Sequence, residues 1–397
     1  MLKILNVSYS DFFGGAAKSA YRINNLLNEI PSIESKMLVI KKISRNKNVI
    51  KFGNKKTDFF FKIKNYVGMM IGKLDNNPYP TSYNFFKSPI IDFINNSDYH
   101  LVNLHWINAE MISIFELNKL QKPYLITLHD MWWICGSENY LTIFDKSWKD
   151  GGFTNLLSKK IWNLKKQLNP IGVVAPSKWL YNCTKLSPIT NKSKIINIPY
   201  PVDFNIYKPQ KINNLKKYNL FKNTKIKILF IVFGNPADSR KGLDLLLKAL
   251  NIIKNKKKFE LIIVGKDLTN LNFNIQSHHV RFISNEKELS KIYNLSDLVL
   301  IPSRIDNLPN VALEAQACGK PIISFDVGGM KDIIKHNYNG YLVKPYDIKK
   351  FSYYIEYLIT NKRKLDKLSS NSIKFSRNLF SKKKIKILYK NFLKQII

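Results

Sequence analysis

Residues 301–329 read IPSRIDNLPNVALEAQACGKPIISFDVGG and contain the pattern on which the fold depends. An apolar run ends at Ile301, a polar loop follows it, and a helix-length segment begins near Pro309 or Asn310. A second apolar run occupies residues 321–325. A strand, a crossover helix and a second strand form the βαβ unit from which parallel sheets are built. The stretch therefore predicts an α/β fold.

Short apolar runs alternate with helix-length amphipathic segments on both sides of this stretch. The strands predicted in the first half of the chain are residues 2–8, 36–40, 99–104, 124–128 and 171–175. The strands predicted in the second half are residues 226–233, 259–264, 280–283, 298–301, 321–325 and 340–343. Because 397 residues exceed what one hydrophobic core usually serves, we predict two Rossmann-like domains.

The boundary between these domains is marked by residues 198–209 (IPYPVDFNIYKP), where prolines interrupt both periodicities and indicate a linker. A second βα series begins after it. The last amphipathic stretch, residues 362–397, is longer than a single connection requires. We predict an N-terminal domain of residues 1–200, a C-terminal domain of residues 201–379, and a helix at about residues 380–397 that packs back onto the first domain.

The composition is strongly basic, with 64 Lys and Arg against 28 Asp and Glu and a net charge of +36. Such a charge attracts phosphates or anionic lipids, although a composition rich in Lys, Asn and Ile accounts for it equally well. The basic residues are spread over the whole chain without a nucleic-acid-binding module, so we expect no nucleic acid partner. Cys135, Cys183 and Cys318 lie far apart in no metal-ligand spacing, which argues against disulfides and zinc.

The expected location is the cytoplasm, because residues 2–8 resemble a buried strand and not a signal peptide. Residues 59–73 (FFFKIKNYVGMMIGK) are unusually apolar for a connection and are punctuated by lysines. Two interpretations remain open for them. They form either a helix packed against its own domain, or an interfacial helix that holds the protein peripherally on the anionic inner face of the plasma membrane.

Candidate ligand-binding residues follow the strands, at the carboxyl edge where open α/β sheets bind ligands. Gly14 and Gly15 follow the first strand and precede a helical pattern, so they form either an anion-binding helix start or simply a tight turn. His129 and Asp130 follow the strand YLITL and either face the crevice or form a buried histidine bonded to its own aspartate. Trp132 lies two residues after Asp130 and is an aromatic residue that suits the apolar face of a sugar.

A second histidine, His105, follows an earlier strand and either lines the same crevice or lies buried beneath it. In the second half, a strand ends at Gly234, and Arg240 and Lys241 stand just before a helix. Two cations at this crevice would neutralise a diphosphate leaving group, although in so basic a chain they are equally typical of a solvated surface.

The most informative candidates are Asp306 and Glu314, the first in a loop and the second about one turn into a helix. Their carboxylates would accept hydrogen bonds from sugar and ribose hydroxyls, while Asn307, Leu308 and Asn310 surround a helix start whose N–H groups suit phosphate oxygens. The alternative is a surface salt bridge for Glu314. No Asp-x-Asp occurs, so we expect cations and helix termini to act without a metal.

Taken together, these motifs resemble the GT4 family of retaining, GT-B-fold glycosyltransferases, especially its bacterial surface-polysaccharide members. The likeness extends over nearly the whole chain and depends on the order of its landmarks, which are Gly14-Gly15-Ala16, LHDMW, VAPSKWL, IPYPVD, SRKGLDLLLKAL, PSRIDNLPNVALEAQACGKP and NGYLVKPYD. The resemblance implies two Rossmann-like domains facing each other across a cleft. It also implies an acceptor in the first domain, a nucleotide sugar in the second, and no metal.

The resemblance further implies roles for individual residues. Asp306 would contact the transferred sugar, Glu314 the ribose, and Arg240 with Lys241 the departing diphosphate. Gly15 would face the same phosphates, and His129 would lie near the reacting sugar, with His105, Asp130 and Trp132 on the acceptor side. Two positions differ from the common pattern: Asp306 stands where Glu is usual, and Asn235 stands where an Arg is frequent.

The function predicted from the sequence is transfer of a hexose from a nucleotide-diphosphate sugar to a glycan or lipid-linked oligosaccharide, in the biosynthesis of a surface polysaccharide such as capsule or O-antigen. Two alternatives use the same architecture: a non-catalytic glycan- or partner-binding protein, and an epimerase or phosphorylase.

Overall fold

The computed structural model describes residues 1–397 apart from 75–76, 78–79, 143, 154, 213–223, 233–237, 266–267, 269–270 and 272. Residue contacts divide the chain into two compact units. The first contains Met1–Pro201 together with Ile385–Ile397, and the second contains Val202–Lys384. Each unit is built around its own parallel sheet.

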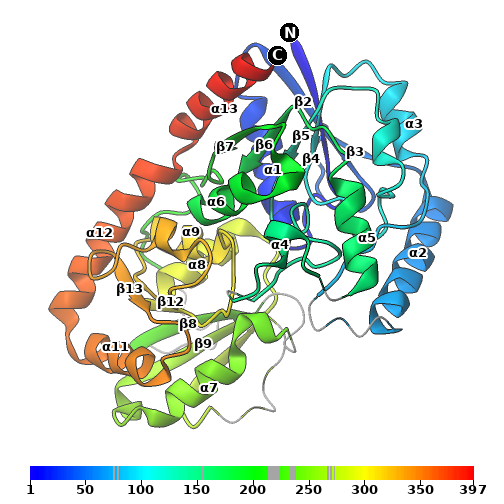
Figure 1. The fold of residues 1–397 in the computed structure, drawn as a ribbon. Helices are drawn as coiled ribbons and strands as arrows, with labels where there is room; N and C mark the ends of the chain where they lie inside the picture. The colour runs from blue at the N-terminus through cyan, green and yellow to red at the C-terminus, as the bar shows by residue number, and fades with distance from the viewer. Residues whose placement is uncertain are drawn as a thin grey trace. The chain divides into compact units, whose positions relative to one another are not determined.

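The first unit contains a seven-stranded sheet of order β3-β2-β1-β4-β5-β6-β7 (Figure 1). Its strands are β1 (Leu2–Val7), β2 (Ile33–Val39), β3 (Val49–Lys51), β4 (Leu101–Leu104), β5 (Tyr124–Thr127), β6 (Gly172–Ala175) and β7 (Lys194–Asn197). All neighbours pair in parallel. The strand order reverses between β1 and β4, which is where a doubly wound sheet opens a crevice at its carboxyl edge.

The central strands β4, β5 and β6 are buried at every residue (LVNL, YLIT and GVVA), as expected for a parallel sheet covered on both faces. The helices of this unit are α1 (Gly15–Leu27), α2 (Lys55–Leu74), α3 (Ile90–Asn95), α4 (Ser147–Asp150), α5 (Leu156–Lys165) and α6 (Lys178–Leu186).

The C-terminal helix α13 (Lys382–Ile396) begins in the second unit and belongs to the first from Ile385 onward. Phe392 is buried against β6, where a β-carbon added to Gly172 would come within 2.6 Å of the Phe392 ring. Lys386 Nζ also lies 3.0 Å from the carboxylate of Glu29. The end of the chain thus helps to close the core of the first unit.

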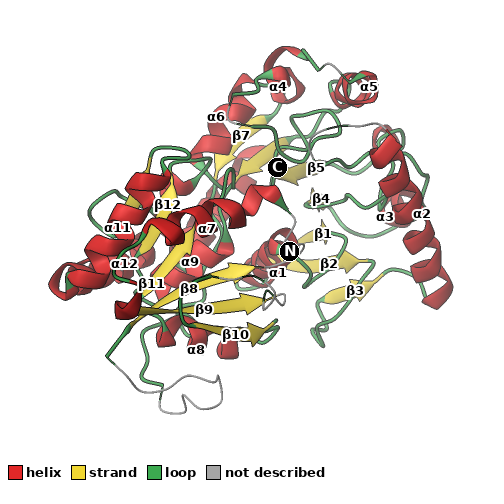
Figure 2. Cartoon of the chain, turned by 90° about the horizontal axis from the view of Figure 1, so that it is seen from below, coloured by secondary structure: helices red, strands yellow, loops and turns green. Residues whose placement is uncertain are grey.

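The second unit contains a six-stranded parallel sheet of order β10-β9-β8-β11-β12-β13, in which Figure 2 labels β10, β9, β8, β11 and β12. Its strands are β8 (Ile226–Val232), β9 (Phe259–Gly265), β10 (Ser277–Arg281), β11 (Leu298–Ile301), β12 (Ile322–Phe325) and β13 (Gly340–Val343). Its helices are α7 (Leu243–Ile252), α8 (Glu286–Leu295), α9 (Asn310–Ala317), α10 (Met330–Ile333), α11 (Ile348–Thr360) and α12 (Lys362–Phe380). The strand order reverses between β8 and β11.

Three strands depart from the sequence-based expectations, and all three lie at sheet edges. β3 and β7 were not predicted, because β3 is three residues long and β7 (KIIN) has no fully buried residue. β10 lies at Ser277–Arg281 and not at residues 280–283, since its half-buried SHHVR sequence has no apolar run. An edge strand has one partner and little burial, so its sequence carries a weak signal.

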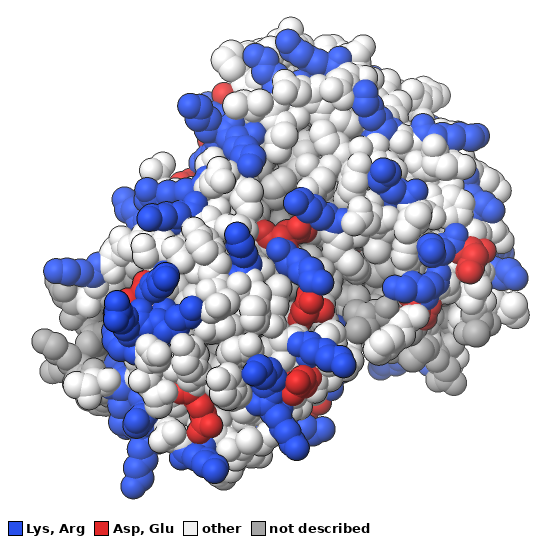
Figure 3. All heavy atoms as spheres, turned by 60° about the vertical axis from the view of Figure 1, so that its left-hand side comes forward, with Lys and Arg blue, Asp and Glu red and all other residues white. Residues whose placement is uncertain are grey.

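Positive charge is spread over the surface of both units. In the face drawn in Figure 3, Lys and Arg side chains are scattered and greatly outnumber Asp and Glu. Among the described residues, none of the helices combines the length and apolarity that crossing a membrane requires.

Candidate functional site

The second unit's candidate residues gather around the carboxyl ends of β8 and β11. Gly234 and Asn235, which follow β8, lie outside the described residues. A short 3-10 turn, Ser239–Lys241, comes next and leads through Gly242 into α7. Asp238 caps this turn by accepting a hydrogen bond from the Arg240 backbone N–H at 3.1 Å. The cationic pair is therefore held in a defined turn at the strand-order reversal.

The two cations of this turn each meet a carboxylate. Arg240 donates to both carboxylate oxygens of Asp238, from Nε at 3.0 Å and from Nη2 at 2.6 Å. Lys241 Nζ lies 2.8 Å from Oδ2 of Asp306, which is 65 positions further along the chain. The structure thus brings together the basic motif and the first acidic residue of the predicted donor site.

Backbone contacts fix the two loops against each other. The Arg304 N–H donates to the carbonyl oxygen of Arg240 at 2.7 Å. Gly242 has φ of 67°, and a β-carbon there would lie 1.9 Å from the carbonyl oxygen of Pro302. Only glycine combines this left-handed conformation with such a close approach. The Lys241–Asp306 pair therefore depends on a rigid junction between the loops that follow β8 and β11.

Asp306 is anchored from its other side by the turn after β12. Its carbonyl oxygen accepts a hydrogen bond from the Gly329 N–H at 3.1 Å. Gly328 has φ of 53°, and a β-carbon there would lie 1.8 Å from the same oxygen. The Asp306 side chain accepts the Asn307 backbone N–H at 3.0 Å through Oδ1, so Oδ2 is directed to Lys241.

The helix α9 begins beside this loop, with Asn310 as its first residue and no side chain capping its N-terminus. Asn307 and Leu308 are buried in the preceding loop. Glu314 lies one turn into α9 and is only 1% exposed, which is incompatible with a surface salt bridge. Its Oε2 accepts a hydrogen bond from the Tyr293 hydroxyl at 3.0 Å. Burial, and the neighbouring Glu314 charge, raise the pKa of Tyr293 well above its ordinary value.

In the first unit, the predicted histidines form one buried chain of contacts. His105 Nε2 lies 2.9 Å from Oδ1 of Asn6, and His105 Nδ1 lies 3.0 Å from Nε2 of His129. His129 Nδ1 in turn lies 2.8 Å from the Tyr200 hydroxyl. Both ring nitrogens of His129 are therefore engaged, and a direct contact with a substrate requires one of these bonds to be exchanged.

Both histidines are held in the neutral form. Burial lowers the pKa of His129 to about 3. Burial and the nearby His129 ring also lower the pKa of His105 well below its ordinary value. With a single proton on each ring, at Nε2, His105 donates to Asn6, and His129 donates to His105 and accepts from Tyr200. The arrangement fixes the orientation of His129, which is 8% exposed.

The remaining acceptor-side candidates are all buried, with Asp130 8% exposed. Asp130 accepts the Trp132 backbone N–H at 3.0 Å and the Trp106 indole N–H at 3.3 Å. His105 and Trp132 are each 1% exposed, so the structure places both in the core and leaves them almost no surface for an acceptor. The Trp132 indole N–H donates to the Ser82 carbonyl oxygen at 2.7 Å.

The glycine pair lies at the start of α1. Gly14 has φ of 91° and precedes a helix without a side-chain cap, and a β-carbon built on it meets nothing within 4 Å. The backbone there is open to a ligand. Gly15, predicted to precede the helix, is instead its first residue.

The sequence analysis did not predict three residues that surround the two histidines of the first unit: Asn6, Asn103 and Tyr200. Asn6 and Asn103 are register partners on β1 and β4, and their side chains are hydrogen-bonded at 3.0 Å. Asn103 interrupts the otherwise apolar strand β4, and Asn6 interrupts the apolar run from Ile4 to Val7 in β1, which is a usable signal because a buried amide needs a polar partner. Tyr200, in the proline-rich segment, had no comparable signal.

Solved structures of other proteins share the fold over the whole chain. Sucrose-phosphate synthase from Thermosynechococcus elongatus matches with a TM-score of 0.70 at 16% identity, covering 100% of this chain and 99% of that one. HepE of Anabaena in complex with UDP-glucose matches with a TM-score of 0.66 at 16% identity, covering 100% of both chains. This confirms the predicted fold class, GT-B with two parallel-sheet α/β domains.

Sequence comparison finds relatives for part of the chain. Residues 212–375 match the family described as glycosyl transferases group 1. An uncharacterized glycosyltransferase of Methanocaldococcus jannaschii is 32% identical over 155 residues, which are 37% of this chain and 39% of that protein. An uncharacterized 41.2 kDa protein in the cps region of Klebsiella pneumoniae is 28% identical over 181 residues, 45% of this chain and 49% of that protein.

These matches span less than half the length of either curated relative. The part of the chain that matches the group 1 glycosyl transferases, residues 212–375, includes the Lys241–Asp306 pair and Glu314.

Proposed function

We propose that this protein is a retaining, metal-independent glycosyltransferase that moves a hexose from a nucleotide-diphosphate sugar to a glycan or a lipid-linked oligosaccharide in surface polysaccharide biosynthesis. The observation that carries the proposal is the 2.8 Å pair between Lys241 and Asp306 beside the uncapped start of α9. A sugar nucleotide as donor is supported by HepE, which has the same fold and was solved with UDP-glucose. The polysaccharide role is supported by the relative in the Klebsiella cps region.

In this proposal, the diphosphate is bound by Arg240, Lys241 and the N–H groups at the start of α9. These groups are fixed before the reaction, so they stabilise the charge that grows on the bridging oxygen as the sugar–phosphate bond breaks. Asp306 accepts a hydrogen bond from a hydroxyl of the hexose. Glu314 accepts one from the ribose, at a position held by the Tyr293 hydroxyl.

The acceptor is assigned to the first unit. We assign two of its residues to the reaction: His129, in an orientation fixed by Tyr200 and His105, and Asp130, which would accept a hydrogen bond from an acceptor hydroxyl. The acceptor hydroxyl attacks on the face from which the diphosphate leaves, so the anomeric configuration is retained. The cations take the part that a divalent ion has in other transferases, and activity is expected to be unchanged by a chelator.

The test is a turnover assay with a panel of labelled nucleotide sugars, preceded by a thermal-shift screen that identifies the donor. A transferase releases nucleoside diphosphate only when an acceptor is present, and the product keeps the donor's anomeric configuration. Donor binding without turnover for any acceptor would indicate a non-catalytic binding protein. A change of sugar stereochemistry without transfer would indicate an epimerase, and transfer to inorganic phosphate a phosphorylase.

A further inference from the structure

The helix α2 carries its apolar side chains on the surface. Only Phe61, Lys64 and Gly68 are buried along its 20 residues. Eight of its large apolar residues are exposed, including Phe59 at 65% and Leu74 at 80%; the others are Phe60, Ile63, Tyr66, Val67, Met69 and Met70. A helix that only covers its own domain directs such residues inward.

The exposed residues form a continuous stripe. Phe59, Ile63, Tyr66 and Met70 follow one another at intervals of four, three and four, which places them on one face of a helix. At 1.5 Å per residue, the 20 residues of α2 extend over about 30 Å.

The inner face of α2 is fixed, so the stripe cannot turn inward. Lys64 Nζ donates to the carbonyl oxygen of Lys87 at 2.9 Å. A β-carbon added to Gly68 would lie 2.8 Å from Oε1 of Glu110, an atom that also accepts the Asn84 N–H at 2.8 Å. Close glycine packing and a buried lysine thus determine which side of the helix faces out.

The charges around the stripe are almost all positive. Lys55, Lys56, Lys62 and Lys73 are exposed, and the one acidic residue of the helix, Asp58, is paired with Lys51 at 2.7 Å. A surface of apolar side chains bordered by lysines is complementary to a bilayer that contains anionic lipids. A second copy of the chain fits less well, because it would bring one lysine border against another.

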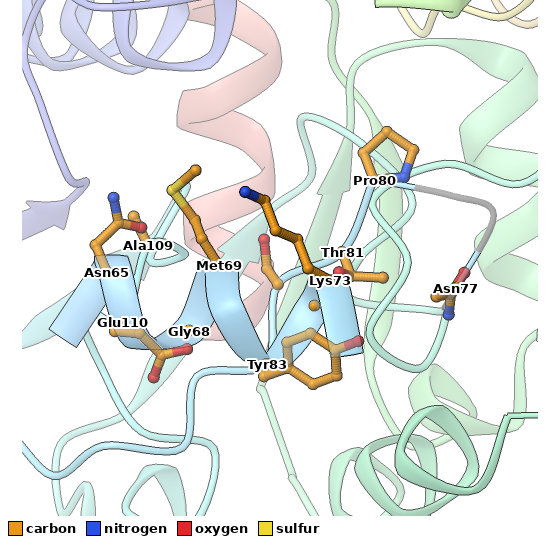
Figure 4. Close-up of a pocket in the computed structure, with 12 residues that line it drawn as sticks. Asn65, Gly68, Met69, Lys73, Asn77, Pro80, Thr81, Tyr83, Ala109 and Glu110 are labelled. Atoms are coloured by element: carbon orange, nitrogen blue, oxygen red, sulfur yellow. The ribbon is translucent and has the colours of Figure 1, made fainter. Parts of the chain in front are cut away.

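A groove of about 530 Å³ runs beside the stripe, between α2 and residues 80–83. Figure 4 shows Met69 and Lys73 on α2 among the residues that line the groove, with Thr81 close to Lys73. Lys73 has no ion-pair partner in the described part of the chain. The groove thus offers an apolar wall, a cation and hydroxyl groups to a phosphate on a lipid. The Glu110 carboxylate also lines it, but its two oxygens accept the backbone N–H groups of Asn84 and Phe86.

We propose that α2 docks this protein on an anionic membrane surface. The stripe from Phe59 to Met70 enters the lipid interface, the bordering lysines meet lipid phosphates, and the groove takes one phosphate head group beside Lys73. This docking rests on the proposed function and deepens it. It names the membrane as a partner, and it favours a lipid-linked oligosaccharide over a soluble glycan as the acceptor. It is measured without donor or acceptor, so its failure leaves the transfer assay untouched.

The experiment is flotation of the full chain with vesicles of phosphatidylcholine alone and of phosphatidylcholine with phosphatidylglycerol, at low and high salt. The wild type is expected to float with the anionic vesicles at low salt, and less at high salt, because screening weakens attraction between charges. Ile63→Glu is expected to reduce the bound fraction at least tenfold. Leu186→Glu is the matched control, because Leu186 is an apolar residue on α6 that is at least as exposed as Ile63 (58% against 47%), and this variant should bind like the wild type.

Lys73→Ala tests the groove, and it should weaken binding to anionic vesicles severalfold more than Lys178→Ala, a matched lysine on α6. Equal effects of the two lysine variants would refute the head-group site. A wild type that stays at the bottom at low salt would overturn the docking proposal, as would equal losses for Ile63→Glu and Leu186→Glu. Light scattering without vesicles adds a further outcome: a wild-type dimer that Ile63→Glu makes monomeric, with no lipid binding, would identify the stripe as a self-association surface.

Discussion

Replacing Lys241 by alanine separates the catalytic role of the Lys241–Asp306 pair from its structural one. The lysine side chain is 34% exposed and the aspartate side chain 12%, so the pair is partly screened by solvent. An ion pair of this kind contributes at most about 1 kcal/mol to the free energy of unfolding. In a domain of this size, that is a loss of roughly 2–4 °C in melting temperature.

The expected effect on transfer is much larger. Lys241 is a charge fixed by Asp306 in the turn proposed to bind the diphosphate, and removal of one such preorganised group costs about 2.7–4 kcal/mol, or 10²- to 10³-fold in kcat. The assay is initial-rate kinetics at saturating donor and acceptor, with the melting temperature measured on the same preparation.

The matched control is Lys291→Ala. Lys291 pairs with Glu288 at 2.7 Å and is 39% exposed, yet it lies on α8 and has no predicted contact with the donor. It should lose a similar small amount of stability and keep its rate. If Lys241→Ala transferred sugar at the wild-type rate under saturating donor, charge neutralisation by this residue would be wrong.

Three further predictions follow from single contacts. Gly242→Ala should lower the free energy of unfolding by more than about 1 kcal/mol, measured in denaturant, because alanine is strained at φ of 67° and its methyl group would meet the Pro302 carbonyl oxygen; a stability unchanged from wild type would contradict the packed junction. Tyr293→Phe should raise the donor KM more than it lowers kcat, since it removes only the 3.0 Å hydrogen bond to Glu314, worth about 1 kcal/mol; an unchanged KM would argue against a ribose contact there. The unfolding free energy should fall as pH drops below about 6.5, because the unfolded chain then protonates His105 and His129, which the folded state keeps neutral, at up to about 1.4 kcal/mol per pH unit for each. Chemical denaturation between pH 7.5 and 5 checks this, and His129→Gln should flatten the slope relative to wild type.

The fold could be predicted because its central strands are short, wholly apolar and separated by helix-length segments. β4, β5 and β11 lie inside their predicted ranges, since a strand buried on both faces has no room for a polar surface pattern. The edge strands β3 and β7 could not be recognised in the same way, because an edge position neither demands burial nor supplies a second partner.

In the candidate donor site, the positions of the residues after strands were predictable from the sequence, but their contacts were not. That Lys241 and Asp306 both follow strands at the order reversal was predictable from the topology of doubly wound sheets. Their 2.8 Å contact was not, because it depends on glycines 242 and 328, whose packing against carbonyl oxygens is visible only in three dimensions. Likewise the link between Asn6 and Asn103 depends on strand register, which sets two residues 97 positions apart side by side.

Residues 59–73 show most clearly why periodicity alone could not decide. The sequence left two interpretations open, a helix packed on its own domain and an interfacial helix, and each assumed that the apolar side makes the contact. In the structure, the helix packs on its unit through Phe61, Lys64 and Gly68, a set that no apolar pattern would select. A glycine contributes to packing by letting the backbone approach, and a buried lysine by donating to a carbonyl oxygen, so neither registers as hydrophobic. The apolar stripe therefore takes no part in packing the helix on its unit and stays exposed to solvent. This exposed apolar surface is the reason for proposing a membrane as its partner.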